Sequence, residues 1–158
     1  MRTLFGSLAS LGLLVVLLPA ASMLSGCDSD GNGGVTCMDT EAFDIEDITP
    51  DSTTTGDTVE DGACVSVTYV GRRFDDGFEF DSGSGLRFFV GQGGGVINGF
   101  WLGVREQKVG ETRRVIIPSS LGYGSRELTD GGEVIIPACA TLEFEVTVDD
   151  ILPSSSCF

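Results

Sequence analysis

The chain has no histidine among its 158 residues, and its 9 basic residues are outnumbered by 24 acidic ones. The lack of histidine removes the commonest general base of enzymes. No segment shows the pattern of a serine or cysteine nucleophile beside a base. The net charge of −15 disfavours nucleic acid and anionic membrane surfaces as partners, because both carry the same sign. A function that needs no reactive side chain is therefore favoured.

Cysteine spacing argues against a metal site. No two of the cysteines Cys37, Cys64, Cys139 and Cys157 have CxxC spacing, and without histidine a zinc site is disfavoured. An even number of cysteines in an exported domain predicts two disulfides instead. Four cysteines allow three connectivities, and composition does not choose among them. We expect no metal and no cofactor.

The N-terminus has the pattern of a secretory signal. Arg2 is a short basic region, and the apolar run at residues 11–18 is too short to span a bilayer. The predicted signal ends in Leu24-Ser25-Gly26-Cys27, which resembles a bacterial lipobox and implies a lipid on Cys27. Ordinary signal cleavage near Ala21 is the alternative. The lipobox predicts a protein of the bacterial cell envelope, anchored to the inner or outer membrane and facing the periplasm or exterior.

Three parts follow from composition. Residues 1–26 are the predicted lipoprotein signal peptide, and residues 27–42 are a lipidated flexible tether rich in Asp, Gly, Ser and Thr. Residues 43–158 form the globular domain, which we expect to be a monomer. The mature chain would carry 8 basic and 24 acidic residues, a net charge of −16, since residues 1–27 contain one arginine and no acid.

The globular part has the periodicity of strands with one helix. Alternating apolar and polar residues predict strands at 43–48, 65–70, 78–80, 86–90, 111–117 and 142–148. The apolar spacing from 98 to 107 predicts a helix. The expected class is α+β, a curved antiparallel sheet of about five strands wrapped around one short helix.

Several motifs recur in the order of a known family. They are Tyr69…Phe80-Asp81, then Val96-Ile97-Asn98-Gly99-Phe100, and then Tyr123-Gly124…Ile135-Ile136-Pro137…Phe144. Together, over residues 43–152, they resemble the FK506-binding (FKBP) family of peptidyl-prolyl cis-trans isomerases. The resemblance implies an isomerase that assists the folding of exported proteins. Its expected partners are proline-containing polypeptides, with the macrolides FK506 and rapamycin as candidate ligands.

The resemblance also implies roles for individual residues. The expected catalytic set is Asp81, near the twisting carbonyl, Tyr69, whose hydroxyl holds Asp81, and Tyr123, whose hydroxyl binds a substrate carbonyl. The Ile97 backbone N–H would bind another carbonyl, and Phe100 would form the pocket floor. The other expected substrate-binding residues are Phe80, Leu86, Phe88, Val96, Ile136 and Phe144.

The implied reaction suits a chain without nucleophiles. Rotation about an X–Pro amide must overcome a barrier of ~18–20 kcal/mol, but no bond is made or broken. The twisted amide loses resonance, so its carbonyl is less dipolar than that of the planar amide. A dry apolar pocket therefore favours the transition state over the hydrated ground state.

Some assignments have competing interpretations. Core packing is an equal alternative for Phe88 and Phe144, and Asp81 and Tyr123 could be plain turn residues. Leu86 stands where family members have an aromatic residue, and the flap, defined as residues 124–134, is longer than in compact members. A non-catalytic peptide-binding or chaperone module on a lipid anchor is therefore the alternative function.

The resemblance also implies which cysteines form disulfide bonds with each other. If the last strand lies antiparallel beside the strand from Val65, Cys157 comes close to Cys64. If the first strand runs parallel to the last with one strand between them, Cys37 comes close to Cys139. We therefore predict the pairs Cys64–Cys157 and Cys37–Cys139.

Overall fold

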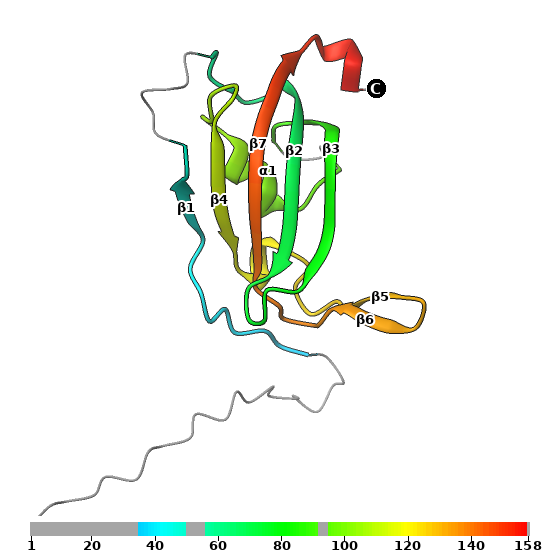
Figure 1. Cartoon of the computed structure of the whole chain (residues 1–158). Coiled ribbons are helices and arrows are strands. Elements are labelled where there is room, and N and C mark those ends of the chain that lie inside the picture. The colour runs from blue at the N-terminus through cyan, green and yellow to red at the C-terminus, as the bar shows by residue number, and fades with distance from the viewer. Residues whose placement is uncertain (1–34, 50–55, 92–94, 158) are drawn as a thin grey trace, which may run out of the picture.

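Five strands form one antiparallel sheet in the order β1-β4-β7-β2-β3 (Figure 1). The computed structural model describes residues 35–49, 56–91 and 95–157. The predicted α+β class, with one helix against one curved sheet, is confirmed. Along the chain the elements are β1 (Asp44–Asp47), β2 (Cys64–Arg73), β3 (Glu79–Phe89), α1 (Asn98–Val104), β4 (Thr112–Ile117), η2 (Ser119–Leu121), β5 (Leu128–Asp130), β6 (Glu133–Ile136), β7 (Leu142–Leu152) and η3 (Ser154–Cys157).

The signal peptide and lipidation site predicted for residues 1–26 and Cys27 lie outside the described residues. Within the described ranges, no helix is long and apolar enough to cross a membrane. In the same ranges, no group of three or more acidic, cysteine or histidine side chains is placed to hold a metal ion.

Strand β7 lies at the centre of the sheet, between β2 and β4. Its alternating sequence places Leu142, Phe144, Val146 and Val148 on the inner face, where each is at most 5% exposed. Burying one such side chain stabilises a fold by about 1.5–3 kcal/mol. This inner face is the wall against which α1 packs, and it carries Phe144 into the cavity described below.

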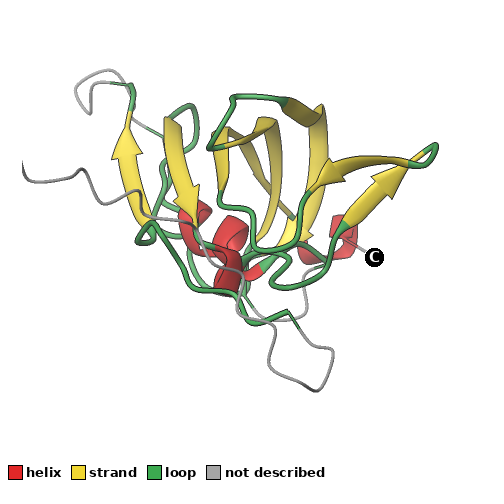
Figure 2. Ribbon diagram, turned by 90° about the horizontal axis from the view of Figure 1, so that it is seen from below, coloured by secondary structure: helices red, strands yellow, loops and turns green. Residues whose placement is uncertain are grey.

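Helix α1 packs closely against β4 because two of its residues are glycines (Figure 2). A Cβ atom on Gly99 would lie 2.3 Å from Ile117 Cγ2, and one on Gly103 would lie 2.6 Å from Val115 Cγ2. Such separations are far below van der Waals contact. Only glycine at these positions therefore lets α1 approach the sheet to this distance.

The helix ends earlier than the predicted residue 107. It stops at Val104, and Arg105 leaves the helical conformation with ψ of 137°. The side chain of Gln107 is buried and donates hydrogen bonds to the Glu111 and Val146 carbonyls at 2.7 and 3.0 Å. The backbone also turns to another segment at this point, since the Glu106 N–H donates to the Val59 carbonyl at 3.0 Å and the Val59 N–H donates to the Gln107 carbonyl at 2.9 Å.

The flap contains a two-stranded hairpin that the sequence patterns did not predict. Strands β5 and β6 pair with each other and not with the main sheet, and the turn is made at Gly131 and Gly132. Both glycines have positive φ, which a tight hairpin turn requires. Figure 2 shows the hairpin projecting away from the sheet.

Both predicted disulfides are present. Cys64 is bonded to Cys157 where β2 begins and the chain leaves β7. Cys37 is bonded to Cys139 near the opposite end of the sheet, just before β7 begins. The strand geometry assumed in the prediction is also found, since β2 and β7 are antiparallel and β4 separates β1 from β7.

The disulfide of Cys37 corrects the predicted tether. Residues 27–42 were assigned to one flexible segment, but the chain is already fixed to the domain at Cys37. Asp39 is also hydrogen-bonded to Ser119 and Ser120. Residues 37–42 are therefore attached to the folded domain, because a covalent bond holds the chain at Cys37.

Candidate active site

A cavity of about 440 Å³ opens where the loop before α1 faces the flap across the inner face of the sheet. Its walls come from β2, β3, β7, α1, that loop and the flap region. The lining residues are Tyr69, Phe80, Asp81, Leu86, Gly95, Val96, Ile97, Phe100, Tyr123, Arg126 and Phe144. Nine of the eleven residues predicted as catalytic or substrate-binding are among them.

The floor of the cavity is a cluster of aromatic rings centred on Phe100. The Phe100 ring lies 5.0 Å from that of Phe144, 5.7 Å from that of Tyr69 and 5.5 Å from that of Phe88, between centroids. The pairs with Phe144 and Tyr69 are edge-to-face, the arrangement that ring quadrupoles favour. Phe100 is only 3% exposed, so the floor is rigid and apolar.

Gly71 makes room for this cluster, and sequence reasoning missed it. A Cβ atom there would lie 2.7 Å from Phe144 Cε1 and 2.8 Å from Phe80 Cζ. The two rings meet edge-to-face over the glycine, 5.6 Å apart. The only available signal was a glycine inside a strand, a position that often marks close approach of another group.

Two predicted substrate-binding residues do not line the cavity. Phe88 is 2% exposed and packs behind Phe100, and Ile136 is 3% exposed in the core. Neither side chain lines the cavity, so core packing, the alternative considered for Phe88, is what the structure shows there. Phe144, for which the same alternative was open, does reach the cavity.

The polar groups of the site gather around Asp81. The Tyr69 hydroxyl donates a hydrogen bond to Asp81 Oδ2 at 2.7 Å, as expected from the sequence. Burial raises the pKa of Tyr69 to about 12, with further contributions from the hydrogen bond and negative charge of Asp81. Burial also raises the pKa of Tyr123, the charge of Asp81 adds to the rise, and the charge of Arg126 opposes it. Both phenols therefore stay protonated and can donate hydrogen bonds at neutral pH.

The N-terminal end of α1 presents a backbone donor to the cavity. The Ile97 carbonyl accepts a hydrogen bond from the Phe100 N–H at 3.1 Å, which fixes the peptide beside it. The Ile97 N–H donates to no acceptor among the described residues. Trp101, which follows Phe100 by about 100° of helix rotation, is half-buried outside the cavity, and its Nε1 donates to Asn98 Oδ1 at 3.3 Å.

Arg126 is a second residue that the sequence analysis overlooked. It lies in the flap, is exposed, and lines the cavity together with Asp81 and the two tyrosines Tyr69 and Tyr123. The signal that could have identified it is its position three residues after Tyr123, where it is the sole cation of the flap.

Comparison with known proteins identifies relatives of this chain. Residues 56–149 match the model of the family described as FKBP-type peptidyl-prolyl cis-trans isomerase. The FK506-binding protein of Streptomyces anulatus is 42% identical over 92 residues, which cover 53% of this chain and 73% of that protein. FK506-binding protein 2B of Rhizopus delemar is 41% identical over 92 residues, 56% of this chain but only 42% of that longer protein. The crystal structure of AtFKBP13 superposes with a TM-score of 0.60 at 26% identity, covering 73% of this chain and all of that one.

The raised pKa of Tyr69 gives the first testable prediction. The chain has two tyrosines, so Tyr69→Phe and Tyr123→Phe variants assign each step of a titration followed by tyrosinate absorbance. We expect Tyr69 to titrate near pH 12, and Asp81→Asn to lower that pKa, because the negative charge is lost and an amide oxygen is a weaker acceptor than a carboxylate. A folded-state pKa above the unfolded value of about 10 means that this stabilisation is complete below about pH 10 and lost as pH rises through about 12. Titration of Tyr69 at its ordinary value in the wild type would contradict the site geometry.

Proposed function

The chain belongs to the FKBP-type peptidyl-prolyl cis-trans isomerase family, and we propose that the cavity above Phe100 is where it binds and isomerises X–Pro bonds. The observation that carries this proposal is the coincidence of an aromatic floor with polar groups at its edge, in one cavity. A proline ring is apolar and fits such a floor, whereas the adjacent carbonyls need donors.

Catalysis follows from differential binding. The planar amide is more dipolar than the twisted one, so transfer from water into an apolar cavity costs the ground state more than the transition state. An acceleration of a thousand-fold to a million-fold needs about 4–8 kcal/mol, at 1.36 kcal/mol per factor of ten. Phe100 and Phe144 supply the dry surface for this effect.

The polar groups hold the substrate while the bond rotates. We assign the Ile97 N–H and the Tyr123 hydroxyl as donors to carbonyls that flank the rotating bond. We assign Asp81, which the Tyr69 hydroxyl holds at the edge of the cavity, to interact with the carbon of the twisting carbonyl. None of these groups transfers a proton, which agrees with phenols whose pKa values are raised well away from neutrality.

The residues that line the walls of the cavity suggest which ligands it prefers. Leu86 lines the cavity where an aromatic wall was expected from the family resemblance, so this side is thinner. Relatives are named for binding FK506, and we propose that FK506 and rapamycin bind this cavity as competitors of proline peptides. The thinner wall is expected to weaken the macrolides more than a single proline ring, because they bury more surface.

The decisive experiment measures catalysed isomerisation of an X–Pro peptide by the wild type and by matched variants. Asp81→Asn is expected to lower kcat/KM about tenfold, a loss of about 1.4 kcal/mol of transition-state stabilisation. Tyr123→Phe removes one donor and should cost about 0.5–1.5 kcal/mol. Phe100→Leu should raise KM, because it removes ring contact.

Asp149→Asn is the matched control. It makes the same change of charge at an exposed aspartate that accepts a hydrogen bond from the Thr68 hydroxyl, and Asp149 does not line the cavity. If Asp81→Asn is no worse than this control, the site assignment is wrong. A wild-type protein that suppresses client aggregation without accelerating isomerisation would instead support the non-catalytic chaperone module.

We further propose that the protein is exported and held at a bacterial membrane by a lipid on Cys27. The motif Leu24-Ser25-Gly26-Cys27 and the two disulfides support this, since disulfides persist in oxidising compartments. Its clients would then be exported proteins. Several acyl chains on one cysteine anchor stably, at about 0.8 kcal/mol per buried CH₂.

Fatty-acid labelling of the full chain in a bacterial host tests the anchor. The wild type should incorporate labelled acyl groups and sediment with membranes, whereas Cys27→Ala should do neither. Cys157→Ser is the control, since it removes a different thiol and should leave labelling intact. A mature N-terminus near residue 22 in the wild type, with no label, would show ordinary signal cleavage and refute the anchor.

A further inference from the structure

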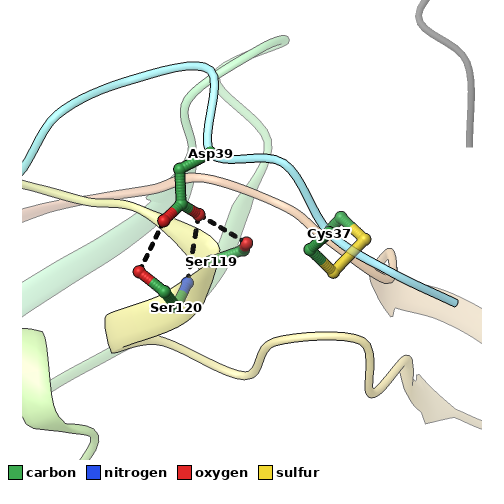
Figure 3. The surroundings of a disulfide bond; sticks show 5 residues. Cys37, Asp39, Ser119 and Ser120 are labelled. Atoms are coloured by element: carbon green, nitrogen blue, oxygen red, sulfur yellow. Dashed lines mark hydrogen bonds between the residues drawn. A yellow bond between two sulfur atoms is a disulfide. The ribbon is translucent and has the colours of Figure 1, made fainter.

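The N-terminal segment is attached to the base of the flap, about 80 residues away in sequence. Asp39 accepts hydrogen bonds from the Ser119 hydroxyl at 2.7 Å, the Ser120 hydroxyl at 2.5 Å and the Ser120 backbone N–H at 3.1 Å (Figure 3). These residues begin η2, where Pro118 makes no side-chain cap. Asp39 thus supplies from a distant segment the acceptor that a capping side chain normally provides.

The other end of the flap is attached to the same segment. Cys37 is disulfide-bonded to Cys139, whose backbone N–H donates to the Gly124 carbonyl at 2.8 Å. The Gly124 N–H in turn donates to the Ser119 carbonyl at 2.9 Å. Cys139 has φ of 64°, a conformation that non-glycine residues rarely adopt, so the surrounding contacts must hold it there. Tyr123 lies inside this ring of contacts, between Ser119 and Gly124.

We propose that residues 37–39, here named the strap, position Tyr123 and the flap for catalysis. Cys37 and Asp39 are positioning residues in this scheme, since neither lines the cavity. The inference rests on the proposed role of Tyr123 as a substrate donor. It goes beyond that role by placing the control of its geometry in a segment that precedes the first strand of the domain.

Two different interactions hold the two ends of the flap. The charged carboxylate of Asp39 holds one end through Ser119 and Ser120, and the covalent Cys37–Cys139 bond holds the other. Hydrogen bonds from Ser120 and Ser119 hold the pKa of Asp39 below its usual value, so the carboxylate is ionised at neutral pH. The Cys37–Cys139 bond needs an oxidising environment to persist. The complete strap is therefore expected only in a protein that has left the cytoplasm.

Two variants, each lacking one of the two disulfides, provide the matched test. Cys37→Ser/Cys139→Ser removes the strap's bond, and Cys64→Ser/Cys157→Ser removes the bond near the opposite end of the sheet. Asp39→Asn is paired with Asp44→Asn, an exposed aspartate in β1. The readouts are the Tyr123 pKa in a Tyr69→Phe background, kcat/KM for a proline peptide, and urea unfolding to confirm that each variant is folded.

We expect both strap variants to lower the Tyr123 pKa toward its ordinary value, since burial is the main cause of the rise. Misplacement of a substrate-binding group should lower kcat/KM roughly three- to tenfold. Equal effects of the two disulfide removals, or no change in the Tyr123 pKa, would overturn the proposal. If the wild type proves inactive, the proposed function fails, but the Tyr123 titration still decides whether the strap positions the flap.

A second observation concerns Arg126. Among the described residues, Arg72, Arg73, Arg105, Arg113 and Arg114 form ion pairs with acidic side chains, whereas Arg87 and Arg126 do not. No ion pair joins Arg126 to any described residue, in a chain that has 24 acidic residues. Arg126 lines the cavity, and its positive charge acts on Tyr123, where it opposes the rise in pKa caused by burial and by the charge of Asp81.

The geometry points to Arg126 as a specificity residue for clients that carry an acidic residue next to the proline. A carboxylate is the natural partner of an unpaired guanidinium, which presents a planar fork of donors. The inference deepens the proposed function, because it names the class of substrate for the same cavity. Since Arg126 is exposed, the effect is modest and sensitive to salt.

Peptides that differ only in Glu, Gln or Lys before or after the proline test this specificity. We expect the wild type to prefer Glu over Lys roughly three- to tenfold in kcat/KM at one of the two positions, less so at high salt. Arg126→Gln should abolish the preference and Arg126→Glu should invert it. Arg87→Gln is the matched control, since Arg87 on β3 is also exposed and forms no ion pair with a described residue, but does not line the cavity.

A Glu-to-Lys ratio that is the same in the wild type and in Arg126→Glu, at both peptide positions, would overturn this inference. Turnover of the Gln peptide reports on the proposed function by itself, because no charge is involved. An enzyme that isomerises the Gln peptide without any charge preference therefore refutes the role of Arg126 alone.

Discussion

The close approach of α1 to β4 is the constraint on which the site depends. Gly99 and Gly103 leave no side chain between helix and sheet, and a Cβ at either position would overlap Ile117 or Val115. That approach brings Phe100 down onto Phe144, which fixes the floor of the cavity. Because protein interiors are densely packed, an outward shift of the helix would open the floor and admit water. The dry floor that the proposed reaction needs therefore depends on the absence of a Cβ atom at Gly99 and Gly103.

Rigid and adjustable parts of the site have different origins. The aromatic floor belongs to the core, with rings from the helix and the central strands supporting one another. The polar edge is built from Asp81 on β3 and from Tyr123 and Arg126 beside or in the flap. The floor is therefore held by core packing, whereas the polar edge depends on where the flap lies. The proposed strap matters for this reason, since it would hold the flap against the rest of the domain.

The sequence predicted what depends on periodicity and on recurring motifs. The alternation along β7, the motif around Phe100 and the Tyr69–Asp81 contact were all expected, and the structure contains them. Depth within the fold was harder to predict. Phe88 and Ile136 are buried in the same core as Phe100, and only three-dimensional packing shows that they do not line the cavity. Asp39 acts through partners about 80 residues away, so no local pattern could reveal it, and Gly71 had only the weak local sign of a glycine inside a strand.

The attachment at Cys37 changes what a lipid anchor would mean for this domain. With residues up to 42 flexible, the proposed anchor on Cys27 would leave the domain a long reach. Fixation at Cys37 leaves ten peptide steps, which span at most about 35 Å when fully extended. An anchored domain would then stay close to the bilayer, and its tether would leave the fold beside the base of the flap.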